Sequence, residues 1–104
     1  MALYKSTEGG TKSVDSAYYG TFAGPAYGTA INITLGRRPT YVYVYDTNGN
    51  IDWVSFSNGN QVVGVKSDNV DISNSIDITF SDTGFSYTER LTGLSRTVKY
   101  FVVY

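Results

Sequence analysis

The chain has 104 residues and a formal net charge of −1, and its eight Lys and Arg residues are scattered along the sequence. This length corresponds to one domain, and the absence of a basic cluster argues against nucleic-acid binding. Because the chain has no cysteine and no histidine, it has no disulfide, no thiolate or imidazole metal ligand and no histidine-activated nucleophile.

The N-terminal residues do not read as a targeting segment. Met1–Ser6 lacks the basic start and the apolar run of about 7–15 residues that a signal peptide has. No stretch approaches the roughly 20 apolar residues of a membrane helix. We therefore expect synthesis in the cytoplasm and no membrane contact.

The N-terminal part is rich in Gly, Ser, Thr and Ala. Gly9-Gly10 and the glycines between Gly20 and Gly28 interrupt any long element. We expect an N-terminal arm over residues 1–16, a first short strand at Ala17–Phe22 and a single β-domain over residues 17–104.

Short strands and turns alternate after Thr29, with a spacing of about 8–12 residues. Asn48-Gly49 and Asn58-Gly59 are typical of hairpin turns. No window has a helical period of about 3.6 residues, so the predicted fold class is all-β, an antiparallel, jelly-roll-like β-sandwich of about eight or nine short strands. The further strands are expected at Ile31–Leu35, Tyr41–Tyr45, Ile51–Phe56, Gln61–Lys66, Val70–Ile72, Ile76–Phe80, Phe85–Leu91 and Thr97–Tyr104.

The strand Tyr41–Tyr45 has large side chains on both faces. Val42 and Val44 point to one side, and three tyrosines point to the other. Thr97–Tyr104 also reads as a strand with two apolar faces. Such strands are covered twice, and in a small domain we expect the second cover to be another subunit or a ligand.

Four aromatic residues are the predicted binding or interface residues, because tyrosine and tryptophan suit surfaces that are dry on one side and wet on the other. The alternative is that β-propensity and core filling explain them. Trp53 lies across the Asn48-Gly49 hairpin from the tyrosines and fits either interpretation. The four residues are Tyr41, Tyr43, Tyr45 and Trp53.

A calcium loop is one alternative for the first hairpin. Asp46, Asn48, Asn50 and Asp52 place oxygen atoms at alternate positions, as a calcium loop does. However, Ile51 stands where the EF-hand pattern has glycine, and a hairpin turn explains the segment without an ion. We predict no metal site and no cofactor.

An acid-pair glycosidase is the enzymatic alternative. Such an enzyme needs two carboxyl groups that flank the sugar bond it cleaves. The only glutamates are Glu8 in the arm and Glu89. Most aspartates lie in or beside turns, where their local hydrogen bonds are favoured. We therefore predict no catalytic residues.

Two parts of the sequence resemble small β-sandwich modules of bacteriophage tail appendages, such as tail-fibre tips, receptor-binding heads and baseplate-associated proteins. The first is Gly28–Val44, with its Leu-Gly-x-x-Pro turn and Val-x-Val strand. The second is Asp82–Tyr87 together with the closing Tyr100–Val103. The resemblance implies a non-enzymatic, oligomeric and often trimeric protein of the virion.

From the resemblance we expect a virion protein made in the host cytoplasm. Its partners would be further copies of itself, with a trimer favoured, other virion tail proteins and, in some modules, host-surface polysaccharide. The alternative is a monomeric carbohydrate-binding module with an aromatic platform. The oligomeric state separates these two hypotheses.

Overall fold

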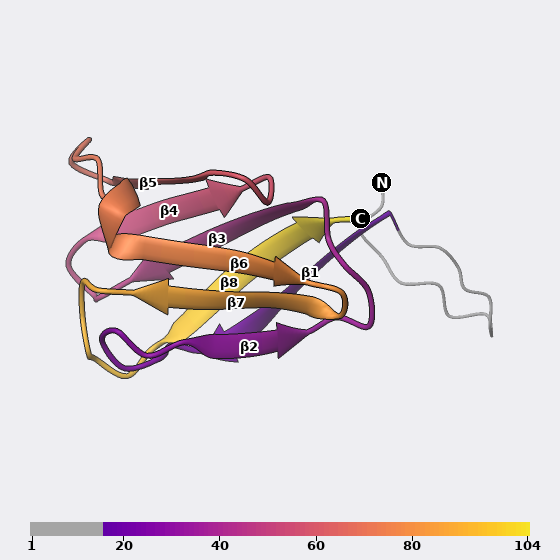
Figure 1. Ribbon diagram of the computed structural model, residues 1–104. Helices are drawn as coiled ribbons and strands as arrows, with labels where there is room; N and C mark the ends of the chain where they lie inside the picture. The colour runs from indigo at the N-terminus through magenta and orange to yellow at the C-terminus, as the bar shows by residue number, and fades with distance from the viewer. Residues whose placement is uncertain (1–15) are drawn as a thin grey trace.

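The computed structural model describes residues 16–104, so the predicted arm lies outside the described residues except for Ser16. In this part of the chain, eight strands form two antiparallel sheets that pack face to face (Figure 1). The prediction of an all-β antiparallel sandwich is confirmed. The strands are β1 (Ala17–Ala23), β2 (Ile31–Thr34), β3 (Tyr41–Thr47), β4 (Asp52–Ser57), β5 (Val62–Lys66), β6 (Ile76–Ser81), β7 (Gly84–Glu89) and β8 (Thr97–Val103).

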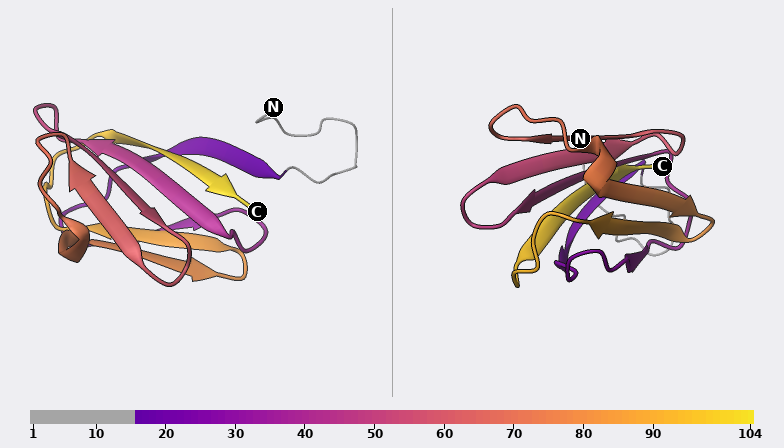
Figure 2. Two further views of the ribbon diagram at one scale, coloured as in Figure 1. Left: turned by 90° about the horizontal axis from the view of Figure 1, so that it is seen from above. Right: turned by 60° about the vertical axis from the view of Figure 1, so that its left-hand side comes forward.

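The two sheets differ in size. One has five strands in the order β1-β8-β3-β4-β5, and the other has three in the order β2-β7-β6. The chain crosses between the sheets after β1, β2, β5 and β7, and Figure 2 shows the resulting two layers. β3 is therefore the central strand of the larger sheet.

Two hairpins of the five-stranded sheet turn where the sequence predicts. Gly49 and Gly59 have φ angles of 94° and 97°, and residues with a Cβ atom rarely adopt such positive values. The Asn48 side chain accepts the backbone N–H groups of Asn50 and Ile51, both at 2.9 Å. These local bonds explain the conformation of the loop between β3 and β4.

The predicted strand Val70–Ile72 is wrong. After β5 the chain turns at Asn69, with a φ of 69°, and folds back over the edge of β5 with a single bridge between Val65 and Asp71. Ile72 donates to the Gly64 carbonyl at 2.8 Å, and the chain then enters the short 3₁₀ helix η1 (Ser73–Ser75). The segment pairs too briefly to continue as a strand.

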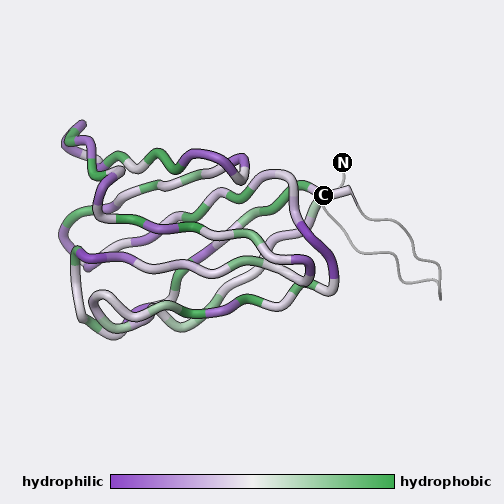
Figure 3. Tube along the Cα trace, in the orientation of Figure 1, coloured by the Kyte–Doolittle hydropathy of each residue, from purple (hydrophilic) through white to green (hydrophobic). Residues whose placement is uncertain are grey.

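The core lies between the inner faces of the two sheets. Apolar and polar stretches alternate along the strands in Figure 3, as half-buried strands require. The buried apolar residues are Val42, Val44, Trp53, Ile72, Ile76, Ile78, Phe85, Tyr87, Val98, Tyr100 and Val102.

In residues 16–104, no helix has the length and apolar character needed to cross a membrane.

Candidate functional site

The tyrosines of β3 lie on the outer face of the five-stranded sheet. Val42 and Val44 point into the core and are fully buried, whereas Tyr41, Tyr43 and Tyr45 on the opposite side are only partly buried. The predicted division of this strand into a valine face and a tyrosine face is therefore confirmed. What covers the tyrosine face stays a prediction.

The strand register extends the tyrosine face across the whole sheet. One residue from each strand lies directly opposite its neighbour, which produces a line of five apolar or aromatic side chains that we name the aromatic row. Its members, from β1 to β5, are Tyr19, Phe101, Tyr43, Phe56 and Val63. Tyr19 is 60% exposed.

A second row runs beside the aromatic row and is more polar at the β1 side. It comprises Thr21, Lys99, Tyr45, Val54 and Val65. β8 therefore does not have two fully apolar faces as predicted, because Thr97 and Lys99 are exposed on its outer side. Only the C-terminal half of β8, with Phe101 and Val103, is apolar on both sides.

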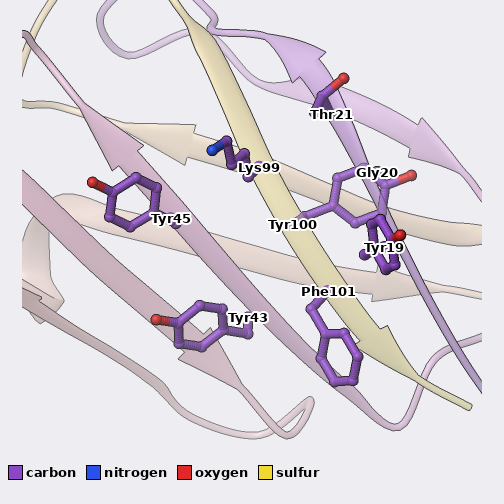
Figure 4. A pocket seen from close by; sticks show the side chains of 8 residues that line it. All are labelled: Tyr19, Gly20, Thr21, Tyr43, Tyr45, Lys99, Tyr100 and Phe101. Carbon is purple, nitrogen blue, oxygen red and sulfur yellow. The ribbon is translucent and has the colours of Figure 1, made fainter. Parts of the chain in front are cut away.

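A hollow of about 560 Å³ lies on this face over β1, β8 and β3. Figure 4 shows the side chains of Tyr43, Tyr45 and Phe101 spread over the strands around it. Lys99 and Thr21 contribute its polar groups. The hollow thus combines aromatic rings with hydroxyl groups and one amine.

Tyr45 and Asp52 form a polar pair at one end of the face. The Tyr45 hydroxyl donates to Asp52 Oδ2 at 2.7 Å, and this bond raises the pKa of Tyr45 above its ordinary value. Hydrogen bonds from the side chains of Thr47 and Tyr45 lower the pKa of Asp52. Asp52 is therefore a stable anion near neutral pH.

The outer face of the three-stranded sheet is different in kind. Its outward positions carry hydroxyl, amide or carboxylate groups, apart from one glycine, as an ordinary solvated antiparallel face does. Within one sandwich, therefore, one outer face is polar and the other is largely apolar and aromatic. The outward side chains of the polar face are Asn32, Thr34, Asp77, Thr79, Ser81, Ser86 and Thr88.

Trp53 does not share the surface of the three tyrosines. It pairs with Asp46 in the register, so its side chain takes the inner face, where it is 2% exposed. Its Nε1 donates to the Tyr87 hydroxyl at 3.1 Å. Trp53 is thus a core residue, and its predicted place in the binding surface is corrected.

The aromatic residues that sequence reasoning missed on the outer face are Tyr19, Phe56 and Phe101. Tyr19 follows Tyr18, and Phe101 lies between Tyr100 and Val102, so the period-two pattern does not say which adjacent position faces outward. Phe56 lies between two serines, which the pattern would place outward, but these serines are buried. The pairing of Tyr43 with both Phe101 and Phe56 resolves it.

A buried ion cluster joins the two sheets behind this face. Arg96 donates from Nε and Nη2 to both carboxylate oxygens of Asp46, at 2.7 and 2.9 Å, and from Nη2 to Glu89 Oε2 at 3.1 Å. The Tyr87 hydroxyl donates to Asp46 Oδ2 at 2.8 Å. Burial first, and then the charge of Asp46, raise the pKa of Tyr87 well above its ordinary value.

This cluster uses the carboxylates on which the enzymatic and calcium alternatives depend. Glu89 is fully buried and accepts the backbone N–H groups of Leu91 and Thr92. Asp46 points into the core while Asp52 points outward from the next strand. The oxygen-bearing side chains of the first hairpin therefore do not converge on a common point.

Comparisons with known proteins find no relative: no family model matches the chain, and neither a curated protein nor a solved structure matches it. Nothing in them links the chain to phage tail proteins, so that resemblance stays a prediction.

Proposed function

We propose that this chain is a non-enzymatic structural module that self-associates through the outer face of its five-stranded sheet. The aromatic row carries this proposal, because it crosses all five strands without a covering layer in the described residues. A small antiparallel sandwich usually has polar outer faces, and contiguous exposed apolar patches mark interaction sites.

The composition of the face supports a protein contact. Tyrosine and phenylalanine are enriched in the centres of interfaces, where charged residues are depleted. The strand residues of this face include one cation, Lys99, and one anion, Asp52. Because Asp46 and Glu89 are paired inside the fold, the cluster that they form favours a structural role.

The proposed setting is a virion, as part of a tail appendage that also docks to other tail proteins. The two segments that carry the resemblance meet in space: the N–H groups of Leu35 and Gly36 both donate to the Thr83 carbonyl, at 2.7 and 3.0 Å. Their association in one corner of the sandwich supports a shared module. The position of the gene among tail genes would test this setting.

The substitution Tyr43→Ala tests the contact surface. Loss of a central aromatic side chain is expected to weaken self-association by about 2 kcal/mol, roughly 30-fold. The unfolding free energy should fall by less than the roughly 3–5 kcal/mol of an emptied core site. Sedimentation and urea denaturation measure the two effects, and Thr79→Ala on the polar face is the matched control.

Two results would contradict this proposal. The first is a light-scattering mass of the wild-type chain near the 11.4 kDa of one copy at micromolar concentration. The second is a large stability loss in Tyr43→Ala with unchanged association, which would place the tyrosine in the monomer core.

Carbohydrate binding is a second candidate function, and the hollow over β1, β8 and β3 favours it. Aromatic rings stack on sugars, while the Thr21 hydroxyl and the Lys99 amine of the hollow can bond to sugar hydroxyls. Affinity electrophoresis in gels containing surface polysaccharide would test it. Retarded migration of a monomer that Tyr45→Ala abolishes would favour this function over self-association.

A further inference from the structure

We propose that two copies pack the outer faces of their five-stranded sheets against each other about a two-fold axis parallel to β3. In this arrangement Lys99 of each copy pairs with Asp52 of the other. This inference rests on the proposed self-association and names its partner and geometry. The occupant of the face is thus a second copy of this chain in an isologous contact, in which each residue pair occurs twice.

The positions of the two charges on the sheet suggest this axis. Lys99 lies on β8 opposite Tyr45, and Asp52 lies on β4 opposite Thr47. β8 and β4 are the two neighbours of the central strand. A half-turn about an axis along β3 therefore places β8 of one copy over β4 of the other.

The distances suit a long side chain. Along the strand direction, Lys99 and Asp52 are offset by two residues, about 7 Å. Packed sheets are about 10 Å apart. The flexible four-carbon stem of lysine can cover this separation toward an aspartate that extends from the opposite sheet.

Charge complementarity favours a second copy over another partner. Among the described residues Lys99 has no ion-pair partner within its own copy. Asp52 accepts hydrogen bonds from the hydroxyl groups of Tyr45 and Thr47. One charge of each sign makes the face complementary to itself, whereas a face for a strongly acidic or basic partner would carry an excess of one sign.

The size of the face also fits such a pair. Five strands about 4.8 Å apart, each five to seven residues long, cover about 24 Å by about 20 Å, hence roughly 500 Å² per copy. The total of about 1,000 Å² reaches the lower limit of specific interfaces. The aromatic row would form the dry centre, and the two charge pairs would lie toward one end of the contact.

Charge reversal followed by mixing tests this arrangement. In Lys99→Glu each homodimer would hold two Glu–Asp contacts, and in Asp52→Lys two Lys–Lys contacts. Either variant alone should associate at least about tenfold more weakly than the wild type, since facing like charges are costly. An equimolar mixture should recover, because every contact in the mixed dimer pairs opposite charges.

The matched controls change the net charge by the same amount as the test variants. Arg38→Glu and Asp82→Lys make the same charge changes in the loops at one end of the sandwich, where the native pair is exposed and 3.6 Å apart. These variants should associate like the wild type.

The outcomes separate this inference from the proposed function. Sedimentation equilibrium of the wild type and of each variant, with circular dichroism to check folding, gives the masses and affinities. A dimer with weakened single reversals and a restored mixture supports the inference. A wild-type trimer, unaffected reversals or a mixture that does not recover would overturn it while self-association stands, and a monomeric wild type would overturn both.

Discussion

Replacement of Arg96 with methionine should lower the unfolding free energy by about 3–5 kcal/mol, the usual cost of removing one partner from a buried ion pair. The Arg96 side chain is 6% exposed, and its partners Asp46 and Glu89 are fully buried. Without the guanidinium, both carboxylates would stay in the core without a counter-charge.

The hydrogen bonds of Arg96 explain why the loss should be this large. All five of its N–H donors are used: three bond the two carboxylates, and two from Nη1 bond the Pro25 and Leu94 carbonyls, both at 3.0 Å. A domain of this kind has a total stability of about 5–15 kcal/mol. The substitution should therefore remove a large part of it.

Urea denaturation followed by tryptophan fluorescence measures the effect, because Trp53 lies in the same core. If the unfolding free energy falls by about 1.5 kcal/mol per molar urea, the midpoint of the urea transition should fall by roughly 2–3 M. Arg90→Met is the control, since the Arg90–Asp77 pair at 2.8 Å is 41% and 56% exposed and such surface pairs contribute about 0–1 kcal/mol. Equal losses in the two variants would refute the reasoning.

Three further predictions follow from other contacts. Gly84→Ala should cost about 1–3 kcal/mol in urea denaturation, because a Cβ there would collide with the Ile33 carbonyl; an unchanged midpoint would contradict this close approach. Burial raises the pKa of Tyr100 from 10.0 to about 12, so above about pH 10 the unfolded chain loses a proton that the folded chain keeps. Stability should therefore fall between pH 10 and 12, and less steeply in Tyr100→Phe; equal slopes would count against this. Calcium should leave the melting temperature unchanged, because Asp46 binds Arg96 in the core while Asp52 points outward, and a rise of several degrees at millimolar calcium would overturn this reading.

The strand positions could be predicted because their causes are local. Alternating side chains and the Asn-Gly turns mark all eight strands to within two residues at each end. The largest differences are at the ends of β3, which continues to Thr47, and of β7, which ends at Glu89. Val70–Ile72 has the composition of a strand but lacks a partner along its length. Pairing is a tertiary property, and propensity does not report it.

The assignment of side chains to faces could be predicted for β3 and not for β4. In β3 valine alternates with tyrosine, so the sequence places the two residue types on opposite faces, without showing which face is inward. In β4, Trp53 alternates with Val54, and a register shift of one residue exchanges their sides. The observed pairing of Asp46 with Trp53 decides it, and the turn alone does not reveal that pairing.

The ion cluster could not be predicted because its members are distant in sequence. Arg96 and Asp46 are 50 residues apart, and Arg96 reads as an ordinary charge in a loop. Glu89 has apolar and polar neighbours in equal measure, so its full burial has no local signal. Only the packing of the two sheets brings these charges together.

The same cluster also determines which residues the outer face presents. Asp46 follows Tyr45 directly, so the inward position of one fixes the outward position of the other. A slip of β3 by one residue would move Asp46 to the outer face and break its bonds to Arg96 and Tyr87. It would also place the tyrosines in the core and the valines outside. The buried ion pairs therefore oppose the one register error that would remove the aromatic surface, which connects the polar interior of this sandwich to the contact face proposed for its function.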